Sequence, residues 1–350
     1  MKKLLSVLLA LTLVFTLASA ALAEKIGVAM PTQSLQRWNQ DGSNMKAQLE
    51  EAGYEVDLQY ANNEAALQVT QLEQMLLGEA KVLVVASIDG LALGTVLAQA
   101  KEAGVPVIAY DRLIMQSDAV NYYATFDNEK VGTIQGQYIE EKLGLAEGNG
   151  PFNIELTGGS PDDNNARFFF KGAWDVLSPY VENGQLVVKS GQTEFEQIAT
   201  PGWDTAVSQS RMDNIITTYY SDGTKLDAVM CSNDSTAQGV SNALTNAGFT
   251  EFPIITGQDC DITSMKNILA GKQSMSIFKD TRTLAEKVVG MVDAIMKGTE
   301  PEINDTTTYD NGTGYIVPTY LCDPVFADID NYEALLIDSG YYTADQLAAE

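Results

Sequence analysis

The chain has 350 residues, no histidine, and 47 acidic against 21 basic side chains, which gives a net charge of −26 near pH 7. Nucleic acids and anionic membrane surfaces are bound through clustered cations, so this charge argues against both as partners. Without histidine there is no Ser-His-Asp triad, no Cys-His pair and no imidazole metal ligand. Carboxylate, lysine or tyrosine chemistry remains possible, and so does the binding of an uncharged ligand.

The first 23 residues have the pattern of a secretory signal peptide. Lys2 and Lys3 precede an uncharged stretch rich in Leu, Val and Ala that ends in small residues. This pattern predicts cleavage after Ala20 or Ala23. An uncleaved membrane anchor is the alternative, since about twenty apolar residues suffice to span a bilayer. No cysteine follows the apolar stretch, so we expect no lipid anchor and a soluble mature protein that is periplasmic or extracellular.

Strands and helices alternate in the next part of the chain. The expected strands are 25–30, 54–60, 81–86 and 106–110, and the expected helices are 35–52, 64–77 and 91–103. The run 81–86 is almost continuously apolar, as expected of a strand that is buried on both faces. This βαβ alternation predicts a parallel sheet with helices on both faces.

The same alternation restarts after residue 126. The expected strands are 152–157, 185–189, 226–231, 253–256 and 275–278, and the expected helices are 128–142, 166–177, 204–219 and 236–247. Two such runs predict an α/β protein with two doubly wound parallel-sheet domains. The extended segment 120–126 between the runs is expected to act as a defined hinge rather than as a flexible linker.

Polar and aromatic residues follow the predicted strands at the positions where ligands bind in open α/β sheets, and Trp203 stands in a turn before a predicted helix. These candidates are Arg37, Trp38, Asp111, Arg112, Asn164, Asn165, Trp203, Asn233, Asp259 and Lys279. Loop structure or ion pairing is an alternative role for several of them. At the neighbouring helix starts we expect Asp127, Asn128 and Asp234 to be N-caps rather than ligands.

This mixture of side chains suits a sugar. Tryptophan offers a flat apolar platform, Asp accepts hydrogen bonds, Arg donates them in a planar fork, and Asn does both. The charged members are nearly balanced: Arg37, Arg112, Lys279, Asp111 and Asp259. A site for an anionic ligand would carry more cations. Each buried polar group left unpaired costs roughly 1–3 kcal/mol, so a site that closes over a sugar needs many such side chains. A nucleotide is not expected, because no Gly-Lys-Ser/Thr follows the Gly158-Gly159 pair.

The three cysteines, Cys231, Cys260 and Cys322, are not spaced as a metal or redox motif. We expect buried thiols that pack as small apolar side chains. A disulfide between Cys231 and Cys260 is the alternative, because both residues follow strand-like runs. We expect no metal and no cofactor.

Six short segments carry a resemblance to a known family. They are Arg37-Trp38, Tyr110–Arg112, Phe126–Lys130, Gly159–Ala166, Ser232–Asp234 and Gly257–Asp259. In these segments the chain resembles the sugar-binding proteins of bacterial ABC importers. Within the type I periplasmic-binding class it is similar to the xylose-binding and multiple-monosaccharide receptors. The resemblance runs in order along nearly all of the chain after residue 23.

The resemblance implies two lobes joined by three crossovers, with one sugar in the cleft between them. The implied lobes are 24–126 plus about 260–310, and 127–259 plus about 311–350. By match to the family's motifs, the sugar would contact Arg37, Asp111, Arg112, one of Asn164 and Asn165, Trp203, Asn233, Asp259 and Lys279. Trp38 is a weaker match.

The expected function is therefore that of an import receptor, not an enzyme. It would capture an aldopyranose such as xylose, glucose or galactose and deliver it to an ABC permease with its ATPase, as a monomer. One alternative is a sugar sensor that presents its ligand to a chemoreceptor or sensor kinase. A remote alternative is a secreted glycosidase that uses Asp111 and Asp259 as its two carboxylates.

Overall fold

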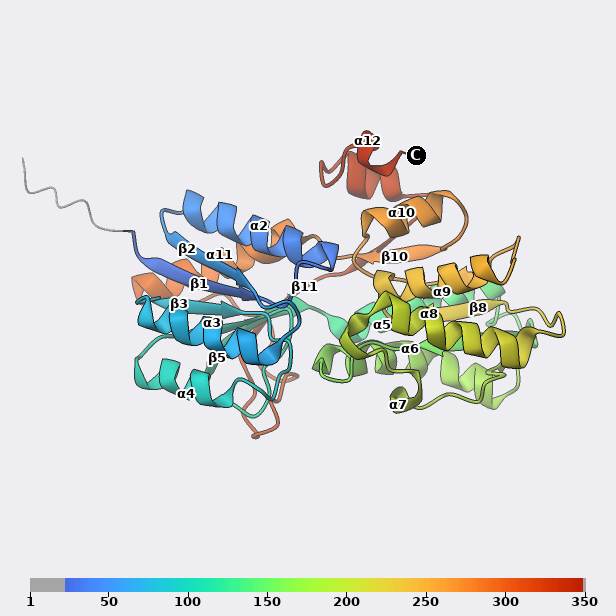
Figure 1. The fold of residues 1–350 in the computed structure, drawn as a ribbon, viewed down its shortest axis with the longest axis horizontal. Helices are drawn as coiled ribbons and strands as arrows, with labels where there is room; N and C mark the ends of the chain where they lie inside the picture. Colours follow the sequence, from blue (N-terminus) through green and yellow to red (C-terminus); the bar gives the residue numbers. More distant parts are fainter. Residues whose placement is uncertain (1–22, 349–350) are drawn as a thin grey trace, which may run out of the picture.

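The computed structural model describes residues 23–348, which form two lobes arranged along the long axis of the molecule (Figure 1). The expected signal peptide lies outside the described residues, apart from Ala23. Within residues 23–348, no helix combines the length and the apolar character that crossing a membrane requires.

The first lobe is built on a six-stranded parallel sheet in the order β11-β5-β4-β3-β1-β2. Its strands are β1 (Lys25–Met30), β2 (Glu55–Tyr60), β3 (Val82–Val85), β4 (Val107–Tyr110), β5 (Val120–Phe126) and β11 (Thr319–Cys322). Its helices are α2 (Gln36–Glu51), α3 (Ala65–Leu77), α4 (Gly94–Glu102) and α11 (Thr281–Lys297). Strands β3 and β4 are buried along their whole length, as the apolar runs predict.

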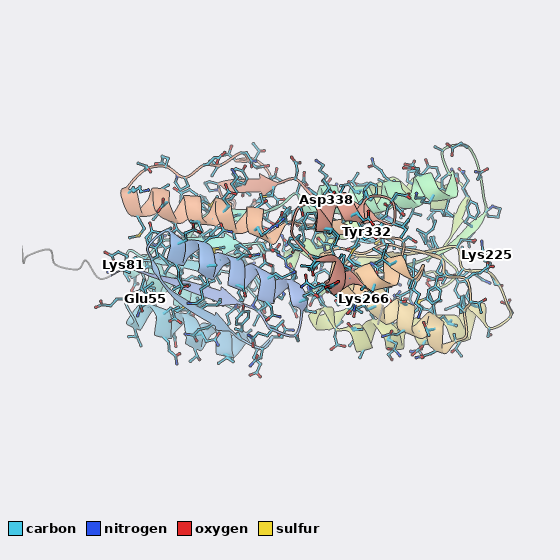
Figure 2. The ribbon with its side chains drawn as sticks, turned by 90° about the horizontal axis from the view of Figure 1, so that it is seen from above. Glu55, Lys81, Lys225, Lys266, Tyr332 and Asp338 are labelled. Atoms are coloured by element: carbon cyan, nitrogen blue, oxygen red, sulfur yellow. The ribbon has the colours of Figure 1, made fainter. Side chains whose placement is uncertain are left out.

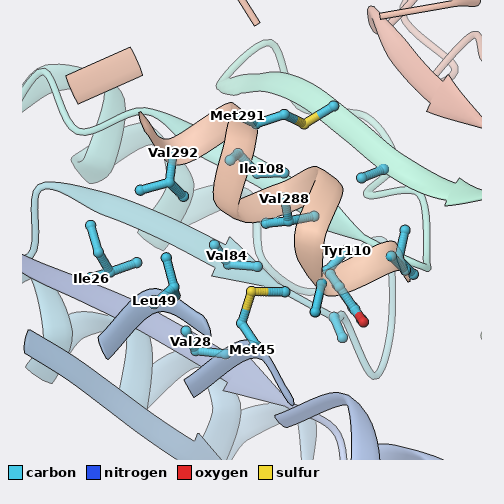
Figure 3. Packing of buried hydrophobic residues seen from close by; sticks show 14 of the residues in the cluster. Ile26, Val28, Met45, Leu49, Val84, Ile108, Tyr110, Val288, Met291 and Val292 are labelled. Carbon is cyan, nitrogen blue, oxygen red and sulfur yellow. The ribbon is translucent and has the colours of Figure 1, made fainter. Parts of the chain in front are cut away.

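Helices α2 and α11 pack together on one face of this sheet. Met45 of α2 and Val288 of α11 meet over Val84 and Ile108 of the central strands (Figure 3). Burying a side chain of this size contributes roughly 1.5–3 kcal/mol. Because the two helices begin at the carboxyl edge of the sheet, this core also fixes where their first turns lie.

The second lobe has a four-stranded parallel sheet in the order β7-β6-β8-β9, and beside it an antiparallel pair of strands. The strands are β6 (Phe152–Thr157), β7 (Leu186–Val187), β8 (Ala228–Cys231), β9 (Ile254–Ile255), β10 (Met275–Phe278) and β12 (Val325–Asp328). The longer helices are α5 (Asn128–Leu143), α6 (Asn164–Glu182), α8 (Thr205–Ile215), α9 (Asp234–Asn246) and α10 (Ile262–Leu269). The short ones are α7 (Phe195–Ile198), η1 (Pro201–Trp203), η2 (Ile216–Tyr220), η3 (Glu333–Ile337) and α12 (Ala344–Leu347).

The chain passes between the lobes three times, after β5, after β10 and after β11. The family resemblance implies that the second and third passages fall near residues 260 and 311, but in the structure both come later. Strand β10 is fully buried and pairs with β12, and Ile277 also bridges to Gln258, so residues 262–278 stay with the second lobe. The turn at Asp259 marks a strand end rather than a change of lobe.

Segment 120–126 is more than a connection between the lobes. It forms β5, which lies between β4 and β11 in the first sheet. Only its end, at Phe126, leads into the second lobe. All nine strands predicted between residues 25 and 278 are present, although β7 and β9 have only two residues each.

The predicted helix caps are partly wrong. Asp127 does cap α5, because its side chain accepts a hydrogen bond from the Lys130 amide. Asn128 and Asp234 are instead the first residues inside their helices, and both are completely buried. The three cysteines are buried and unpaired, so the alternative Cys231–Cys260 disulfide is not formed.

Residues 329–348 form the C-terminal segment, which packs against α10 of the second lobe. Figure 2 shows α10, marked by Lys266, and this segment, marked by Tyr332 and Asp338, in the same region near the middle of the molecule. Leu336 and Tyr342 are buried there in a small apolar cluster that also contains Cys260. The segment therefore lies beside the passage between the lobes.

Candidate functional site

A small cavity lies between the two lobes, where the carboxyl ends of both sheets face each other. The cavity is lined by Leu35, Arg37, Trp38, Asp111, Arg112, Asp163, Asn165, Phe169, Trp203, Asn233, Gln258, Asp259 and Lys279. Nine of the ten residues nominated from the sequence are in this set.

Asn164 is the nominated residue that the structure leaves outside the cavity. It is the first residue of α6, and its neighbour Asn165 lines the cavity instead. Successive helical residues point about 100° apart, so only one of the two can face the ligand space. The choice that the sequence left open therefore falls on Asn165.

The first turn of α2 brings Arg37 into the centre of the site. Its Nε donates to the Oδ2 of Asp41 one turn further along, at 2.8 Å. Its Nη1 lies 3.0 Å from the Oδ1 of Asp111 and 3.4 Å from the Oδ1 of Asp259. Because Asp259 belongs to the second lobe, this guanidinium joins the lobes across the cavity.

Trp38 packs against two guanidinium groups. The Cζ atoms of Arg37 and Arg112 lie 4.3 Å and 4.9 Å from the centroid of its ring. Such cation–π contacts are stabilising, more so in a desolvated position. The indole N–H is buried and has no hydrogen-bond partner among residues 23–348, so an acceptor on a ligand would suit it.

The backbone after β4 is bent into the left-handed region at Asp111, where φ is 60°. The carbonyl of Asp111 accepts three hydrogen bonds, from the hydroxyls of Tyr123 and Thr125 at 2.7 and 2.9 Å and from the Asn165 amide at 2.6 Å. Such a strained residue persists only where its surroundings hold it firmly. These contacts hold the backbone of Asp111 in this conformation, and the bond from Asn165 adds a second link between the lobes.

Asp163 is a site residue that the sequence analysis missed. It stands at the N-cap of α6 and accepts a hydrogen bond from the Asn165 amide at 2.9 Å. Its Oδ2 also lies 2.9 Å from the Nε of Arg112 and accepts from the Trp203 indole at 3.2 Å. A carboxylate directly before a helix predicts an N-cap. The neighbouring residues do not indicate that Asp163 also pairs with Arg112 of the other lobe.

Trp203 reaches the cavity from a tight turn, with φ at 57°. A Cβ atom added to Gly159 would lie only 1.9 Å from the Trp203 ring. Gly159, in a pair that resembles a fragment of a phosphate loop, therefore makes room for the indole. Phe169 packs edge-on against the same ring, with 6.2 Å between the centroids.

Asn233 and Gln258 complete the second lobe's half of the site. Asn233 is the N-cap of α9, and its Oδ1 accepts from the Thr236 amide at 3.1 Å. The Oε1 atom of Gln258 is buried without a partner among the described residues. Gln258 was not nominated, although it directly precedes Asp259 at the same strand end.

Lys279 follows β10 and is 3 % exposed. Its Nζ lies 3.2 Å from the Oδ1 of Asp259 and 3.6 Å from the Oδ1 of Asp111. Three cations, Arg37, Arg112 and Lys279, thus face three carboxylates that line the cavity, with Asp41 as a fourth behind Arg37. The site is close to electrically balanced, as the sequence predicted.

Burial and ion pairing act in opposite directions on these groups. Burial raises the pKa of Asp111, but Arg37, Lys279 and Arg112 outweigh it and leave the pKa below its ordinary value. Burial raises the pKa of Asp163, against the pull of Arg112. Asp41 contacts Arg37 and Tyr110, and burial raises its pKa to about 6.

The site therefore offers fixed acceptors, fixed donors and flat apolar rings around one small volume. Hydroxyl groups both donate and accept, so a ring that carries several of them can pair with carboxylates and guanidiniums together. Two doubly wound lobes with such a cavity at their carboxyl edges define a binding protein of the cleft type.

The chain belongs to the periplasmic binding protein family, because residues 26–300 match the model of the periplasmic binding protein domain. It is 51% identical over 336 residues to the multiple sugar-binding periplasmic receptor ChvE of Rhizobium radiobacter, covering 94% of each chain. It is 34% identical over 346 residues to the D-xylose-binding periplasmic protein of Escherichia coli, covering 99% of each.

Two solved structures extend this similarity to the fold. A solute-binding protein of an ABC transporter from Clostridium phytofermentans, with bound β-D-glucose, is 68% identical with a TM-score of 0.91. The match covers 93% of this chain and all of that one. A carbohydrate transporter solute-binding protein from Chloroflexus aurantiacus, in complex with D-glucose, is 33% identical with a TM-score of 0.84, over 93% and 98% of the chains.

Proposed function

We propose that this protein is a receptor that captures one uncharged monosaccharide, in its aldopyranose form, and delivers it to an ABC import permease. The observation that carries the proposal is the small, charge-balanced cavity whose donors, acceptors and indoles come from both lobes. The relatives named as sugar receptors and the glucose-bound structure at 68% identity support the same ligand class.

In this proposal the sugar acts by closing the two lobes. The first lobe supplies Arg37 and Arg112, and the second supplies Asp163 and Asp259, so neither half alone can surround the ring. A ligand shifts such an equilibrium only by the contacts that it makes in the closed state and not in the open one. Closure also excludes water, which makes each hydrogen bond to a sugar hydroxyl count for more.

The proposed place of action is outside the cytoplasm. The predicted signal peptide and the relatives named as periplasmic proteins support export. The proposed partners are the membrane permease and, through it, its ATPase, with the receptor acting as a monomer. The large negative charge of the chain favours a soluble carrier over one that clings to anionic lipid.

We propose binding rather than catalysis. A glycosidase needs one carboxyl group that keeps its proton near neutral pH. Arg37, Lys279 and Arg112 lower the pKa of Asp111, which is unfavourable for that role. Its nominated partner Asp259 is paired with Arg37 and Lys279, as suits a group that orients a ligand.

A melting experiment tests the ligand class. Any ligand that binds only the native state raises the melting temperature. At a ligand concentration of a hundred times the Kd, it adds about 3 kcal/mol to the free energy of unfolding. We expect D-glucose, D-xylose or D-galactose to produce a clear rise, and D-glucuronate and amino acids to produce less. A shift with another solute class and none with the three aldoses would refute the proposal.

Substitutions test the site itself. Trp203→Ala and Asp259→Ala should each weaken sugar binding by about tenfold to a thousandfold, because each removes a buried partner of the ligand or of a buried cation. Trp174→Ala is the matched control, since Trp174 stacks on Phe170 of the same helix and does not line the cavity. Isothermal calorimetry measures the affinities, and wild-type affinity in both site variants would exclude this site.

A further inference from the structure

The turn that carries Asp259 has an unfavourable backbone. The φ angles of Asp259 and Cys260 are 99° and 51°, in the left-handed region that non-glycine residues avoid. Each such residue costs on the order of 1–3 kcal/mol and persists only where the surroundings hold it. The amide of Asp259 donates to the carbonyl of Ile277 at 2.8 Å. The amides of Cys260 and Asp261 donate to side chains instead.

Asp234 holds both of these amides. Its Oδ2 accepts directly from the Asp261 amide at 2.8 Å. Its Oδ1 accepts from the Ser276 hydroxyl at 2.8 Å, and the oxygen of that hydroxyl accepts from the Cys260 amide at 3.0 Å. Gln273 donates to the same Oδ1 at 3.0 Å. One carboxyl group thus fixes the turn directly on one side and through Ser276 on the other.

The position of Asp234 fits this role rather than ligand contact. Asp234 is completely buried at the start of α9 and does not line the cavity. A Cβ atom on Gly257 would lie 2.2 Å from its Oδ1, so the carboxyl group lies directly beneath the start of the turn. Burial, together with Asp261 and Asp259, raises the pKa of Asp234.

We propose that Asp234 is a positioning residue for ligand binding. It holds the Asp259–Asp261 turn in its strained form, so that the Asp259 carboxylate stays between Arg37 and Lys279 in the closed site. The consequence for a sugar rests on the proposed function, whereas the restraint on the turn does not.

Hydrogen exchange tests the restraint without any sugar. In Asp234→Ala the peptide that covers residues 257–263 should exchange at least about tenfold faster, because two of its amides lose their acceptor network. Ser208→Ala is the matched control: its buried hydroxyl donates to the Thr236 carbonyl of α9 at 2.8 Å, away from the turn. Unchanged exchange in this peptide, or an equal increase in both variants, would overturn the proposal.

A double-mutant cycle with D-glucose, D-xylose and D-galactose tests the link to binding. Asp234→Ala should raise the Kd of the bound sugar about tenfold or more, and Asp234→Asn, which keeps one acceptor oxygen, should restore part of the affinity. In the Asp259→Ala background the same change should matter less than about threefold, because the group that it positions is gone. A merely structural role would lower the melting temperature and leave the Kd of the folded protein unchanged.

The outcomes separate the two proposals. If wild-type protein binds none of the three aldoses, the proposed function fails, and the exchange experiment still decides whether Asp234 holds the turn. If the aldoses bind and Asp234→Ala weakens binding equally with and without Asp259, Asp234 does not act through Asp259, and the positioning role is refuted.

Discussion

Several residues at the cavity combine an unfavourable backbone with a functional side chain. Asp111, Trp203 and Asp259 line the cavity with φ between 57° and 99°, and Cys260 follows at 51°. Each stands at a strand end or a tight turn, where a sharp bend directs the side chain into the space between the lobes. Such strain is tolerated because buried hydrogen bonds hold each position from outside.

Asp41 makes the stability of the protein depend on pH. Burial raises its pKa to about 6, so the folded state holds this proton more tightly than the unfolded chain does. Its contribution to stability is fully present at pH values below the unfolded pKa of about 4 and is lost as pH rises through 6. Between pH 5 and 7 we expect Asp41 alone to lower the free energy of unfolding by about 1 kcal/mol.

Urea unfolding of sugar-free protein at pH 5 and pH 7 measures this effect. Asp41→Asn should remove about 1 kcal/mol of the loss between the two pH values. Asp111, with its lowered pKa, titrates below this window; Asp261, whose pKa burial raises to about 7, titrates within it in both proteins and cancels in the comparison. The control is Asp338→Asn, at an exposed position. The same pH dependence in Asp41→Asn and wild type would contradict the prediction.

At the scale of elements, the close contact between α5 and α6 places one wall of the cavity. A Cβ atom on Gly132 of α5 would lie 2.0 Å from the Phe169 carbonyl of α6. A Cβ atom on Gly172 of α6 would lie 2.0 Å from the Glu129 carbonyl of α5. The helices therefore touch backbone to backbone, which fixes where Asn165 and Phe169 meet the ligand space.

Gly132→Ala is expected to separate these helices. The added methyl group collides with backbone, which cannot rotate away, so we expect about 1–3 kcal/mol of lost stability. Gly290→Ala is the matched control in α11, where an added Cβ meets nothing within 4 Å. This substitution should raise the free energy of unfolding by about 0.5–1 kcal/mol. Thermal or urea unfolding measures both, and a neutral Gly132→Ala would show that the contact is looser than the structure indicates.

At the scale of the molecule, the C-terminal segment links the two lobes outside the cavity. The Tyr342 hydroxyl accepts from Gln36 and Gln40 of α2, at 2.6 and 3.1 Å, and donates to the carbonyl of Cys260 at 2.9 Å. The side chain of Gln36 also accepts from the Ile262 amide of α10 at 3.0 Å. These bonds favour the closed arrangement whatever ligand the cavity holds.

Tyr342→Phe removes only the hydroxyl at the centre of this network. Because the lost bonds do not touch the ligand, we expect the Kd for different aldoses to rise by one common factor, of about threefold to tenfold. Tyr332→Phe is the control, since its hydroxyl reaches only Glu333 in its own segment, at 3.1 Å. Calorimetry with two sugars measures the increase in Kd for each of them. An increase for one sugar alone would contradict a general effect on closure.

The order of residues was enough to predict the two α/β lobes and most of the cavity lining. Runs of apolar residues predict buried strands, and a parallel sheet places the carboxyl ends of its strands at one edge. The charged and aromatic residues after each run could therefore be identified from neighbouring residues alone. That is why Arg37, Asp111 and Asp259 could be nominated together. Strands β11 and β12 and the lobe boundaries escaped, because a short strand near the end of the chain can pair with either sheet.

The roles of Asp163, Asp234 and Gly159 depended on contacts between residues that lie far apart in the sequence. Asp163 resembles an ordinary helix cap until Arg112 of the other lobe lies 2.9 Å away. Gly159 resembles part of a phosphate loop until the Trp203 ring packs against it. Neighbouring residues determine the helix and strand patterns. Ion pairs, close packing and strained turns arise only when the folded chain brings distant residues together.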